Sequence, residues 1–316
     1  MQKTKLTIII VNYNTQHLLS RCLDAVADNL KQISGKVILV DNFSKDDSVN
    51  YIRQHFNNVQ LITNDKNIGF GRANNQAIAE IEGEYVLLLN TDAFLSANTI
   101  SNTILYMDAN PKIGILGVKL TGEDGELQPS CRYFPTLSNI FLTKTGLNKL
   151  FSQVQLIDNK NWDANQTQEC DWVPGCYYLV RKSVIDQIGL FDPRYFMYYE
   201  EVDHCLRAKN AGWKVLYYAD SAVIHLGGES AKSEGKLTSG KQLNALQTES
   251  ELLFFRKNYG ISKLLLHIFL CMLADLYQLF KNLIQFRLSS IKNMAKNNAL
   301  LLKLIFKTHF GQQPTR

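Results

Sequence analysis

Short apolar runs alternate with longer segments of mixed polarity over the first third of the chain. Four of these runs are rich in Val, Ile and Leu and have the length of buried strands: residues 6–11, 36–40, 59–62 and 85–89. Segments of helical length follow them, one ending near residue 30, one beginning near 46, one ending near 81 and one spanning 98–110. This alternation predicts an α/β fold, with a mostly parallel sheet and helices on both faces.

The pattern changes after about residue 113, where the segments become shorter and more mixed. Residues 172–180 are apolar and aromatic, which predicts a loop leading into a strand. A helix is expected to end at Gly212, and residues 213–218 and 222–225 are expected to be strands. Residues 227–241 are rich in Gly, Ser and Lys, which favours a loop.

Polar residues stand where the central strand at 85–89 stops. Asn90, Thr91 and Asp92 follow it directly, and Asp41 follows the strand at 36–40. Open α/β sheets bind ligands beyond the carboxyl ends of their strands. A carboxylate such as that of Asp92 is a hard oxygen donor, which suits Mg²⁺ or Mn²⁺ bound to phosphate. The alternative is that Asn90 and Asp92 are turn residues, with Asp92 capping the next helix.

Glycines at 69 and 71 lie in a segment that resembles a dinucleotide-binding loop, but two features argue against an oxidoreductase. The third glycine of that fingerprint is missing, and Asp41 precedes the glycines although the acidic residue should follow them by about 20 positions. Gly69 and Gly71 would instead let the backbone approach a ligand, with Arg72 pairing to phosphate. Alternatively, this is a glycine-tolerant helix start with a solvated arginine.

A second group of candidate side chains lies near residue 200. Aromatic residues precede Glu200 and Glu201, and crowding with partial burial would raise a carboxyl pKa as a general base requires. The alternative is that both are ordinary acids at a helix start, and that Asp203 pairs with Arg207 one turn away. His225 ends an apolar run and is either a core residue or a metal ligand.

Composition and charge divide the chain in two. Its 316 residues, 46% hydrophobic and 20% charged, are ordinary for a globular protein of one large or two small domains. Of 34 Lys and Arg and 29 Asp and Glu, ten basic residues but only one acid, Asp275, fall in residues 256–316. The net charge of +5 therefore belongs to the tail, which argues for a partner of the tail and against a nucleic-acid-binding protein.

The tail also contains long apolar stretches. A membrane-spanning helix needs about 20 mainly apolar residues, but residues 261–280 are interrupted by Lys263, His267 and Asp275. Apolar residues with many cations and almost no acids suit a helix lying on anionic lipid. We therefore expect membrane association without spanning; an oligomerisation or core-docking helix is the alternative.

The six cysteines form no C-x-x-C pair and no zinc-binding spacing, so we expect buried, reduced thiols in a cytosolic protein. The N-terminus shows no secretory signal, because the apolar residues 6–11 have only strand length and run into polar residues.

Several separated stretches together resemble the inverting nucleotide-sugar glycosyltransferases of family 2, especially their bacterial rhamnosyltransferase-like branch. The matching stretches, which occur in the family's order, are residues 10–14, 40–44, 67–71, 89–92, 174–175, 199–203, 225–228 and 254–260. The resemblance covers roughly residues 5–260.

This resemblance implies a GT-A fold, a divalent metal (Mg²⁺ or Mn²⁺), a dTDP- or UDP-linked sugar donor and a glycan or lipid-linked acceptor. Residues 1–260 would form the GT-A domain, with a nucleotide-sugar-binding half (1–112) and an acceptor or catalytic half (113–260). Residues 261–316 would form a basic amphipathic tail. The protein would be cytoplasmic and peripheral on the inner face of the membrane.

The resemblance also implies residue roles. Asp92 and His225 would bind the metal, and Glu201 would be the base for in-line attack with inversion. Asp41 would contact the nucleoside, and Arg72 would lie near the diphosphate. Further expected donor-binding residues are Asn12, Tyr13, Asn67, Gly69, Asn90, Thr91 and Gly175. Expected acceptor-side or supporting residues are Trp172, Glu200 and Asp203.

Two positions depart from the family pattern. Asn90 replaces the first acid of the D-x-D element, and Glu200-Glu201 replaces the usual Glu-Asp pair. These departures leave open a nucleotide-sugar-binding protein without turnover. A third possibility is a membrane scaffold that uses the basic tail, with the sheet as a structural remnant.

Overall fold

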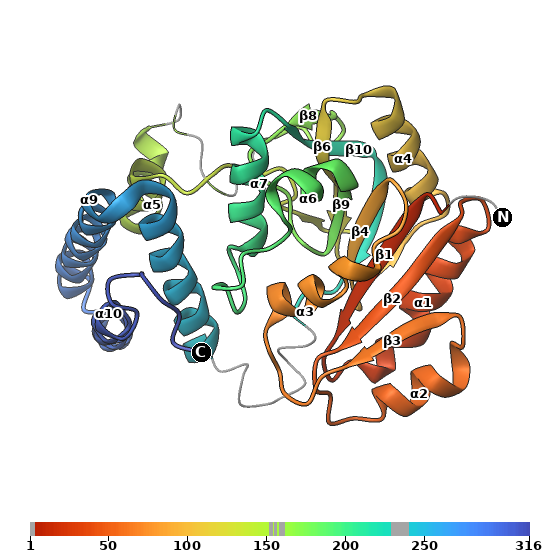
Figure 1. Cartoon of the computed structure of the whole chain (residues 1–316). Coiled ribbons are helices and arrows are strands. Elements are labelled where there is room, and N and C mark those ends of the chain that lie inside the picture. Colours follow the sequence, from red (N-terminus) through yellow and green to blue (C-terminus); the bar gives the residue numbers. More distant parts are fainter. Residues whose placement is uncertain (1–3, 152–153, 155–156, 158–161, 229–239) are drawn as a thin grey trace.

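A computed structural model describes residues 4–151, 154, 157, 162–228 and 240–316. One mixed sheet runs through the described part of the chain, in the order β3-β2-β1-β4-β9-β6-β10-β5 (Figure 1). The short strands β7 and β8 pair with β6 and β10. The predicted α/β architecture is confirmed.

The four predicted strands form the parallel half of the sheet. Their bounds are β1 (Leu6–Asn12), β2 (Gly35–Asp41), β3 (Val59–Thr63) and β4 (Tyr85–Asn90). The pairings among these four strands are all parallel. The connecting helices are α1 (Gln16–Leu30), α2 (Ser48–His55), α3 (Phe70–Gln76) with the 3-10 turn η1 (Ile78–Glu80), and α4 (Thr99–Ala109). The predicted helices lie within a few residues of these bounds.

The second half of the sheet mixes strand directions. Its strands are β5 (Ala93–Leu95), β6 (Ile113–Thr121), β7 (Leu127–Gln128), β8 (Gln168–Glu169), β9 (Tyr177–Arg181) and β10 (Lys214–His225). β9 lies between β4 and β6 and is antiparallel to both. Its helices are α5 (Leu137–Thr145), η2 (Leu147–Leu150), α6 (Lys182–Ile188) and α7 (Glu200–Asn210). The two predicted strands at 213–225 are one strand with a register shift.

Alternate residues of the central strands enter two hydrophobic cores, one on each face of the sheet. Ile8 and Ile10 belong to the core that contains residues of α1, α2 and α4. Ile9 belongs to the core that contains residues of α6, α7 and α9. Helices therefore cover both faces, because each strand carries apolar residues on both sides.

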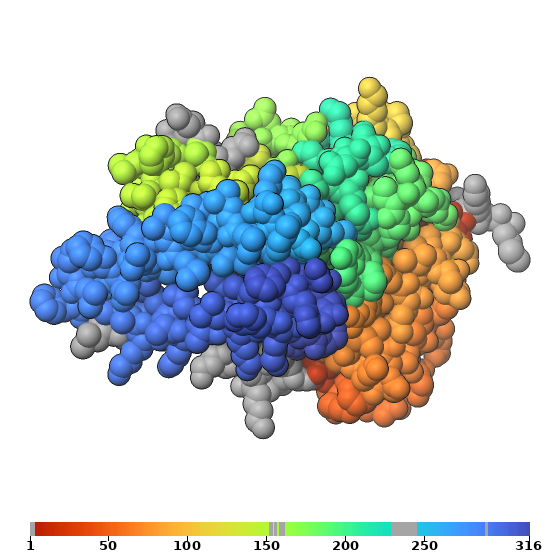
Figure 2. Space-filling view, turned by 60° about the vertical axis from the view of Figure 1, so that its left-hand side comes forward, coloured from red at the N-terminus to blue at the C-terminus, as the bar shows by residue number. Residues whose placement is uncertain are grey.

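The tail is helical and folds back on the rest of the molecule. α9 (Gly240–Ile284) is broken at Gly260, whose φ is +80°, and α10 (Leu288–Lys307) runs beside its second part (Figure 1). In Figure 2 these helices, in blue, lie together along one side of the molecule. Thr315 then donates from its backbone N–H and its hydroxyl to the Glu249 carboxylate, both at 2.7 Å. The chain end thus packs against the first part of α9.

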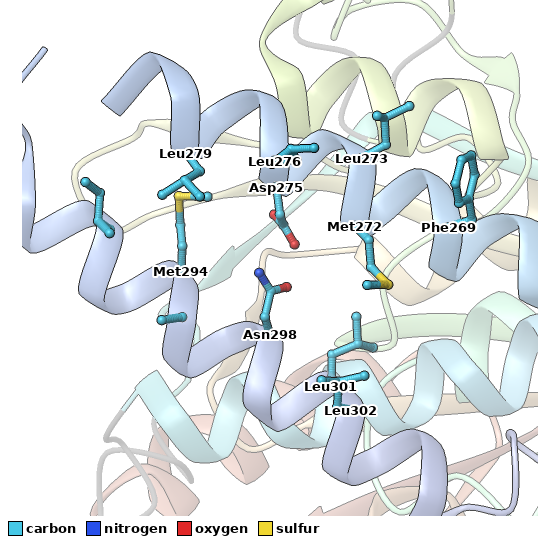
Figure 3. Close-up of a pocket in the computed structure, with 12 residues that line it drawn as sticks. Phe269, Met272, Leu273, Asp275, Leu276, Leu279, Met294, Asn298, Leu301 and Leu302 are labelled. Atoms are coloured by element: carbon cyan, nitrogen blue, oxygen red, sulfur yellow. The ribbon is translucent and has the colours of Figure 1, made fainter. Parts of the chain in front are cut away.

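The second part of α9 exposes many large apolar side chains. Phe269, Leu276 and Phe280 are 60%, 62% and 66% exposed. A groove of about 630 Å³ lies between α9 and α10, where Asp275 and Asn298 face one another among apolar side chains (Figure 3). Within the described residues, Ala245–Ile284 is the helix whose length and composition would allow it to cross a membrane.

All six cysteines are buried and free, as predicted. Most of the loop predicted at 227–241 lies outside the described residues.

Candidate active site

The carboxyl ends of β1, β2 and β4 meet at one edge of the sheet. Asn12 is in register with Asp41, and Val11 with Asn90. Asp92 follows two residues after β4 ends at Asn90. The polar residues predicted from the strand ends therefore gather on this edge, where open α/β sheets bind ligands.

Asp41 is 2% exposed, and both of its oxygens already have protein partners. Asn12 Nδ2 donates to Oδ2 at 2.8 Å, and the Ser44 backbone N–H donates to Oδ1 at 3.0 Å. A carboxylate oxygen accepts more than one hydrogen bond, so these contacts orient Asp41 without using all of its capacity.

Asn12 and Thr91 are buried beneath this edge. The Thr15 hydroxyl donates to Asn12 Oδ1 at 2.7 Å and lies 2.9 Å from the Thr91 hydroxyl oxygen. Their side chains therefore hold the ends of β1 and β4 together. Asn90 and Tyr13 are partly exposed at the same edge.

Asp92 and His225 lie side by side. Asp92 Oδ1 is 3.6 Å from His225 Nε2. Two backbone contacts fix this arrangement: His225 pairs with Ala93 across β10 and β5, and the Leu226 N–H donates to the Asp92 carbonyl at 3.0 Å. Burial lowers the pKa of His225, which favours the neutral imidazole.

This pair fits one divalent cation. A carboxylate oxygen and an imidazole nitrogen are both metal ligands, and their separation is longer than a hydrogen bond. In the described part of the chain no third Asp, Glu, His or Cys joins them to close a metal site. Mg²⁺ in enzymes typically takes one or two protein ligands and completes its shell with water and substrate phosphates. The two residues suit that open kind of site.

The acidic pair begins α7, where the helix dipole favours negative charge. Glu200 Oε2 and Glu201 Oε2 are both buried and have no hydrogen-bond partner among the described residues. Burial, with the neighbouring charge of Glu201, raises the pKa of Glu200 well above its usual value; burial also raises the pKa of Glu201. Both carboxyls therefore bind protons more readily than an exposed glutamate does.

The backbone before this pair is strained. Tyr198 and Tyr199 have φ values of +68° and +67°, in the left-handed region that non-glycine residues rarely adopt. Such conformations persist only where surrounding packing enforces them, and they are common at functional sites. Here Tyr199 packs on Phe254 of α9, with ring centroids 5.3 Å apart.

The glycine-containing loop packs against this same segment. Gly69 has φ +90°, and a Cβ added there would lie 2.3 Å from the Phe196 carbonyl oxygen. Asn67 Oδ1 accepts from the Gly69 N–H at 3.0 Å. Gly175 lies near the Phe70 ring. In this structure Gly69 therefore permits a close backbone contact within the protein.

The structure gives Arg72 two backbone partners. Its Nε donates to the Pro193 carbonyl at 2.7 Å, and a terminal nitrogen donates to the Arg316 carbonyl at 3.0 Å. These bonds tie α3 to the chain end. A contact between Arg72 and a diphosphate stays a prediction.

Arg132 is a cation of the site that the sequence analysis missed. Its guanidinium lies 4.8 Å from the centroid of the Trp172 ring. Its positive charge opposes the rise in the pKa of Glu201 caused by burial, and it adds to the lowering of the pKa of His225 by burial. Arg132 is therefore close enough to act on both the acidic pair and the candidate metal pair.

Asp203 is fully buried within a cluster of charged and polar side chains. Its carboxylate accepts from Arg207 at 2.8 Å, Lys257 at 2.7 Å and Asn258 at 3.1 Å. The pairing with Arg207 is the alternative that the sequence left open. The cluster joins α7 to the first part of α9.

Comparisons with known proteins agree with this architecture. A model of the family described as Glycosyl transferase family 2 matches residues 7–168. A curated N-acetylglucosaminyl-diphospho-decaprenol L-rhamnosyltransferase of Mycobacterium tuberculosis is 29% identical over 239 residues, 70% of this chain and 75% of that protein. Rhamnosyltransferase WbbL of Escherichia coli is 28% identical over 228 residues, 69% of this chain and 82% of that protein.

Solved structures extend the comparison to the fold. The mannosyltransferase PcManGT from Pyrobaculum calidifontis, in complex with GDP-Man and Mn²⁺, superposes with a TM-score of 0.59 at 14% identity, covering 99% of this chain and 89% of that one. Residues 1–349 of Staphylococcus aureus TarS give a TM-score of 0.52 at 14% identity, covering 99% and 93%. These similarities confirm the predicted GT-A fold.

Proposed function

The chain belongs to glycosyl transferase family 2, and we propose that it transfers a sugar, with rhamnose as the first candidate, from a nucleoside-diphosphate sugar to a hydroxyl of a lipid-linked glycan. The names of two relatives, which are rhamnosyltransferases, support this donor sugar. The decaprenyl diphosphate named for one of them supports a lipid-linked acceptor. The observation that carries the proposal is the Asp92–His225 pair beside the carboxyl edge, in a chain that also buries an acidic pair within reach of Arg132.

Donor binding is proposed at the ends of β1, β2 and β4. Asp41, oriented by Asn12 and Ser44, would accept hydrogen bonds from the nucleoside. A divalent cation bound by Asp92 and His225 would neutralise charge on the leaving diphosphate. The side chain of Asn90 is neutral, so Asp92 is the one carboxylate in the segment from Asn90 to Asp92.

Glu201 is the proposed base. It would take the proton from the acceptor hydroxyl while the hydroxyl oxygen bonds to the anomeric carbon and the bond to the diphosphate breaks. The raised pKa of Glu201 suits this step, since a base is most effective when its pKa is near the working pH. A single in-line displacement inverts the anomeric centre.

The tail is proposed to hold the enzyme on the inner face of the cytoplasmic membrane, where a lipid-linked acceptor would be presented. Its exposed apolar side chains on α9 support this placement. Eight of its ten basic residues are exposed as well: Lys263, Lys281, Arg287, Lys292, Lys296, Lys303, Lys307 and Arg316. We place the boundary between the GT-A domain and the tail at Gly260, where the helix breaks.

The test is a donor screen. Purified full-length protein is incubated with Mn²⁺, a lipid-linked glycan acceptor and individual dTDP- and UDP-sugars, and release of nucleoside diphosphate is measured. We expect acceptor-dependent release with dTDP-rhamnose and loss of release with a chelator. Asp92→Asn should remain folded but lose turnover, because a neutral amide binds a hard cation poorly.

Two outcomes would contradict the proposal. Full activity in the presence of the chelator would exclude the metal role of Asp92. Protein that binds donors but transfers to no acceptor would favour the nucleotide-sugar-binding function without turnover.

A further inference from the structure

Gln128 holds His225 at two points. Its Nε2 lies 2.7 Å from the His225 backbone carbonyl oxygen, and its Oε1 lies 2.8 Å from His225 Nδ1. Gln128 lies at the end of the short strand β7, in register with Leu120 of β6, which in turn pairs with Val223 of β10. The backbone pairing of three strands therefore fixes where this amide meets the imidazole.

The two contacts determine the orientation of the amide. A backbone carbonyl oxygen can only accept a hydrogen bond, so the NH₂ group of Gln128 must be the part that faces it. Oε1 of Gln128 then faces His225 Nδ1. An amide oxygen has no proton to donate, so Nδ1 must carry the hydrogen of this bond.

This fixes the tautomer of the imidazole. When a neutral histidine carries its proton on Nδ1, Nε2 presents a lone pair. In His225 that nitrogen lies 3.6 Å from Asp92 Oδ1, so two electron-rich atoms face one another with no hydrogen between them. A cation between them would relieve their repulsion.

We propose that Gln128 is a positioning residue that holds His225 as the Nδ1–H tautomer, with the Nε2 lone pair directed to a metal shared with Asp92. The inference rests on the proposed metal role of Asp92 and His225. Residues behind a metal ligand commonly act this way, and their loss typically weakens metal affinity by about 10–100-fold.

The first experiment reads the tautomer without any metal. Long-range ¹H–¹⁵N NMR on histidine-labelled, metal-free protein at pH 8 separates protonated from unprotonated ring nitrogens, and the His225 signals are identified by their loss in His225→Gln. We expect Nδ1 protonated in the wild type and in Gln128→Glu, which keeps an acceptor oxygen. In Gln128→Leu the preference should be lost.

The second experiment measures Mn²⁺ binding from the EPR signal of free Mn²⁺. Gln128→Leu should bind about 10–100-fold more weakly than the wild type. Gln128→Glu should stay within a few-fold of the wild type. Gln54→Leu, which changes an exposed glutamine of α2, is the matched control and should bind as the wild type does.

The results separate this inference from the proposed function. Protonated Nε2 in the wild type, or unchanged Mn²⁺ affinity in folded Gln128→Leu, would overturn the role of Gln128. Wild-type protein with the Nδ1–H tautomer that binds no Mn²⁺ would contradict the metal site and would support the tautomer assignment. An equal loss of affinity in Gln128→Glu and Gln128→Leu would show that the acceptor oxygen facing Nδ1 does not determine metal binding, and would also overturn the inference.

Discussion

At the scale of single residues, the two carboxyls of the acidic pair differ in the charges that surround them. Glu200 and Glu201 share burial and raised pKa values, and each has one oxygen without a described partner. Arg132 acts on Glu201, whereas the charge that acts on Glu200 is that of Glu201 itself. A nearby cation keeps a buried carboxylate more easily ionised. This difference favours Glu201 as the base.

We therefore expect Glu201→Gln to lower kcat by about 10²–10⁴, the usual contribution of a general base, with donor affinity nearly unchanged. Glu200→Gln should reduce kcat far less. Turnover is measured by nucleoside diphosphate release and donor affinity by calorimetry. A severe loss in Glu200→Gln with near-normal turnover in Glu201→Gln would assign the base to Glu200.

The raised pKa of Glu200 has a consequence for stability. A buried carboxyl whose folded-state pKa lies above its unfolded value of about 4.5 contributes stability below that pH and loses it as the pH rises through the folded pKa. A glutamine at this position carries no charge at any pH. The stability of Glu200→Gln relative to the wild type should therefore increase as the pH rises from about 4.5 towards 8.

Urea unfolding of both proteins at several pH values in this interval measures the difference. Glu126→Gln serves as the control, because Glu126 is exposed in the turn before β7. If the free energy of unfolding of Glu200→Gln relative to the wild type changes as little with pH as that of the control, the burial of an ionisable Glu200 is contradicted.

At the scale of helices and strands, the sequence predicted what local patterns determine. The β1–β4 runs and the helices between them show the expected periodicity, and Asp41 and Asp92 mark the strand ends at which the site forms. Long-range pairing leaves no such signal. β9 enters the sheet between β4 and β6 across more than 50 residues of chain, and nothing in residues 177–181 specifies those neighbours.

Gln128 and Arg132 could not be predicted from the sequence for the same reason, because their contacts are long-range and leave no local pattern. Gln128 lies on a two-residue strand, too short for any periodicity, and meets His225 only through the sheet. Arg132 follows in an irregular segment and stacks on Trp172, 40 positions away. The left-handed backbone at Tyr198 and Tyr199 is enforced by tertiary packing and contradicts their residue type.

The cluster around Asp203 joins two elements, so its loss should affect stability. Asp203→Asn should reduce the free energy of unfolding by about 3–5 kcal/mol, because Arg207 would lose its buried carboxylate and Lys257 would keep only its pair with Asp192. The control is Asp186→Asn, which breaks a pair with Lys182 at the same i,i+4 spacing but in solvent. That change should cost less than about 1 kcal/mol.

Chemical denaturation of the two variants measures this difference. Equal effects would show that the Asp203 cluster contributes no more than a surface ion pair, and would remove the link between α7 and α9 from the proposed site.

At the scale of the whole molecule, the tail is integrated with the sheet domain and yet faces solvent with apolar side chains. Leu304 and Ile305 of α10 enter the same core as Phe255 and Leu264 of α9. Removing everything after Gly260 would therefore expose part of that core. Substitutions on the outer face of α9 test membrane binding without this damage.

We expect the full chain to bind anionic vesicles and the double variant Phe269→Ser/Phe280→Ser to bind them much less. Both side chains are more than half exposed, and burying a phenylalanine contributes about 1.5–3 kcal/mol, so each loss should lower the affinity by roughly tenfold or more. Donor binding should not change, because neither side chain lies at the strand ends. Ile78→Ser/Leu105→Ser, which removes exposed apolar side chains from the sheet domain, is the control and should bind vesicles normally.

The effect of salt on vesicle binding distinguishes electrostatic attraction from apolar burial. Salt and carbonate washes together distinguish a helix on the surface from one that spans the bilayer. Attraction of the exposed lysines to anionic lipid, worth about 1 kcal/mol per basic residue near the surface, is screened by salt, whereas apolar burial is not. Sedimentation with vesicles should therefore show partial release of the full chain at high salt and further release by alkaline carbonate. A helix that spans the bilayer would resist both treatments. If the chain does not bind anionic vesicles at all, the membrane proposal is contradicted, and docking of the exposed face of α9 on another protein is favoured.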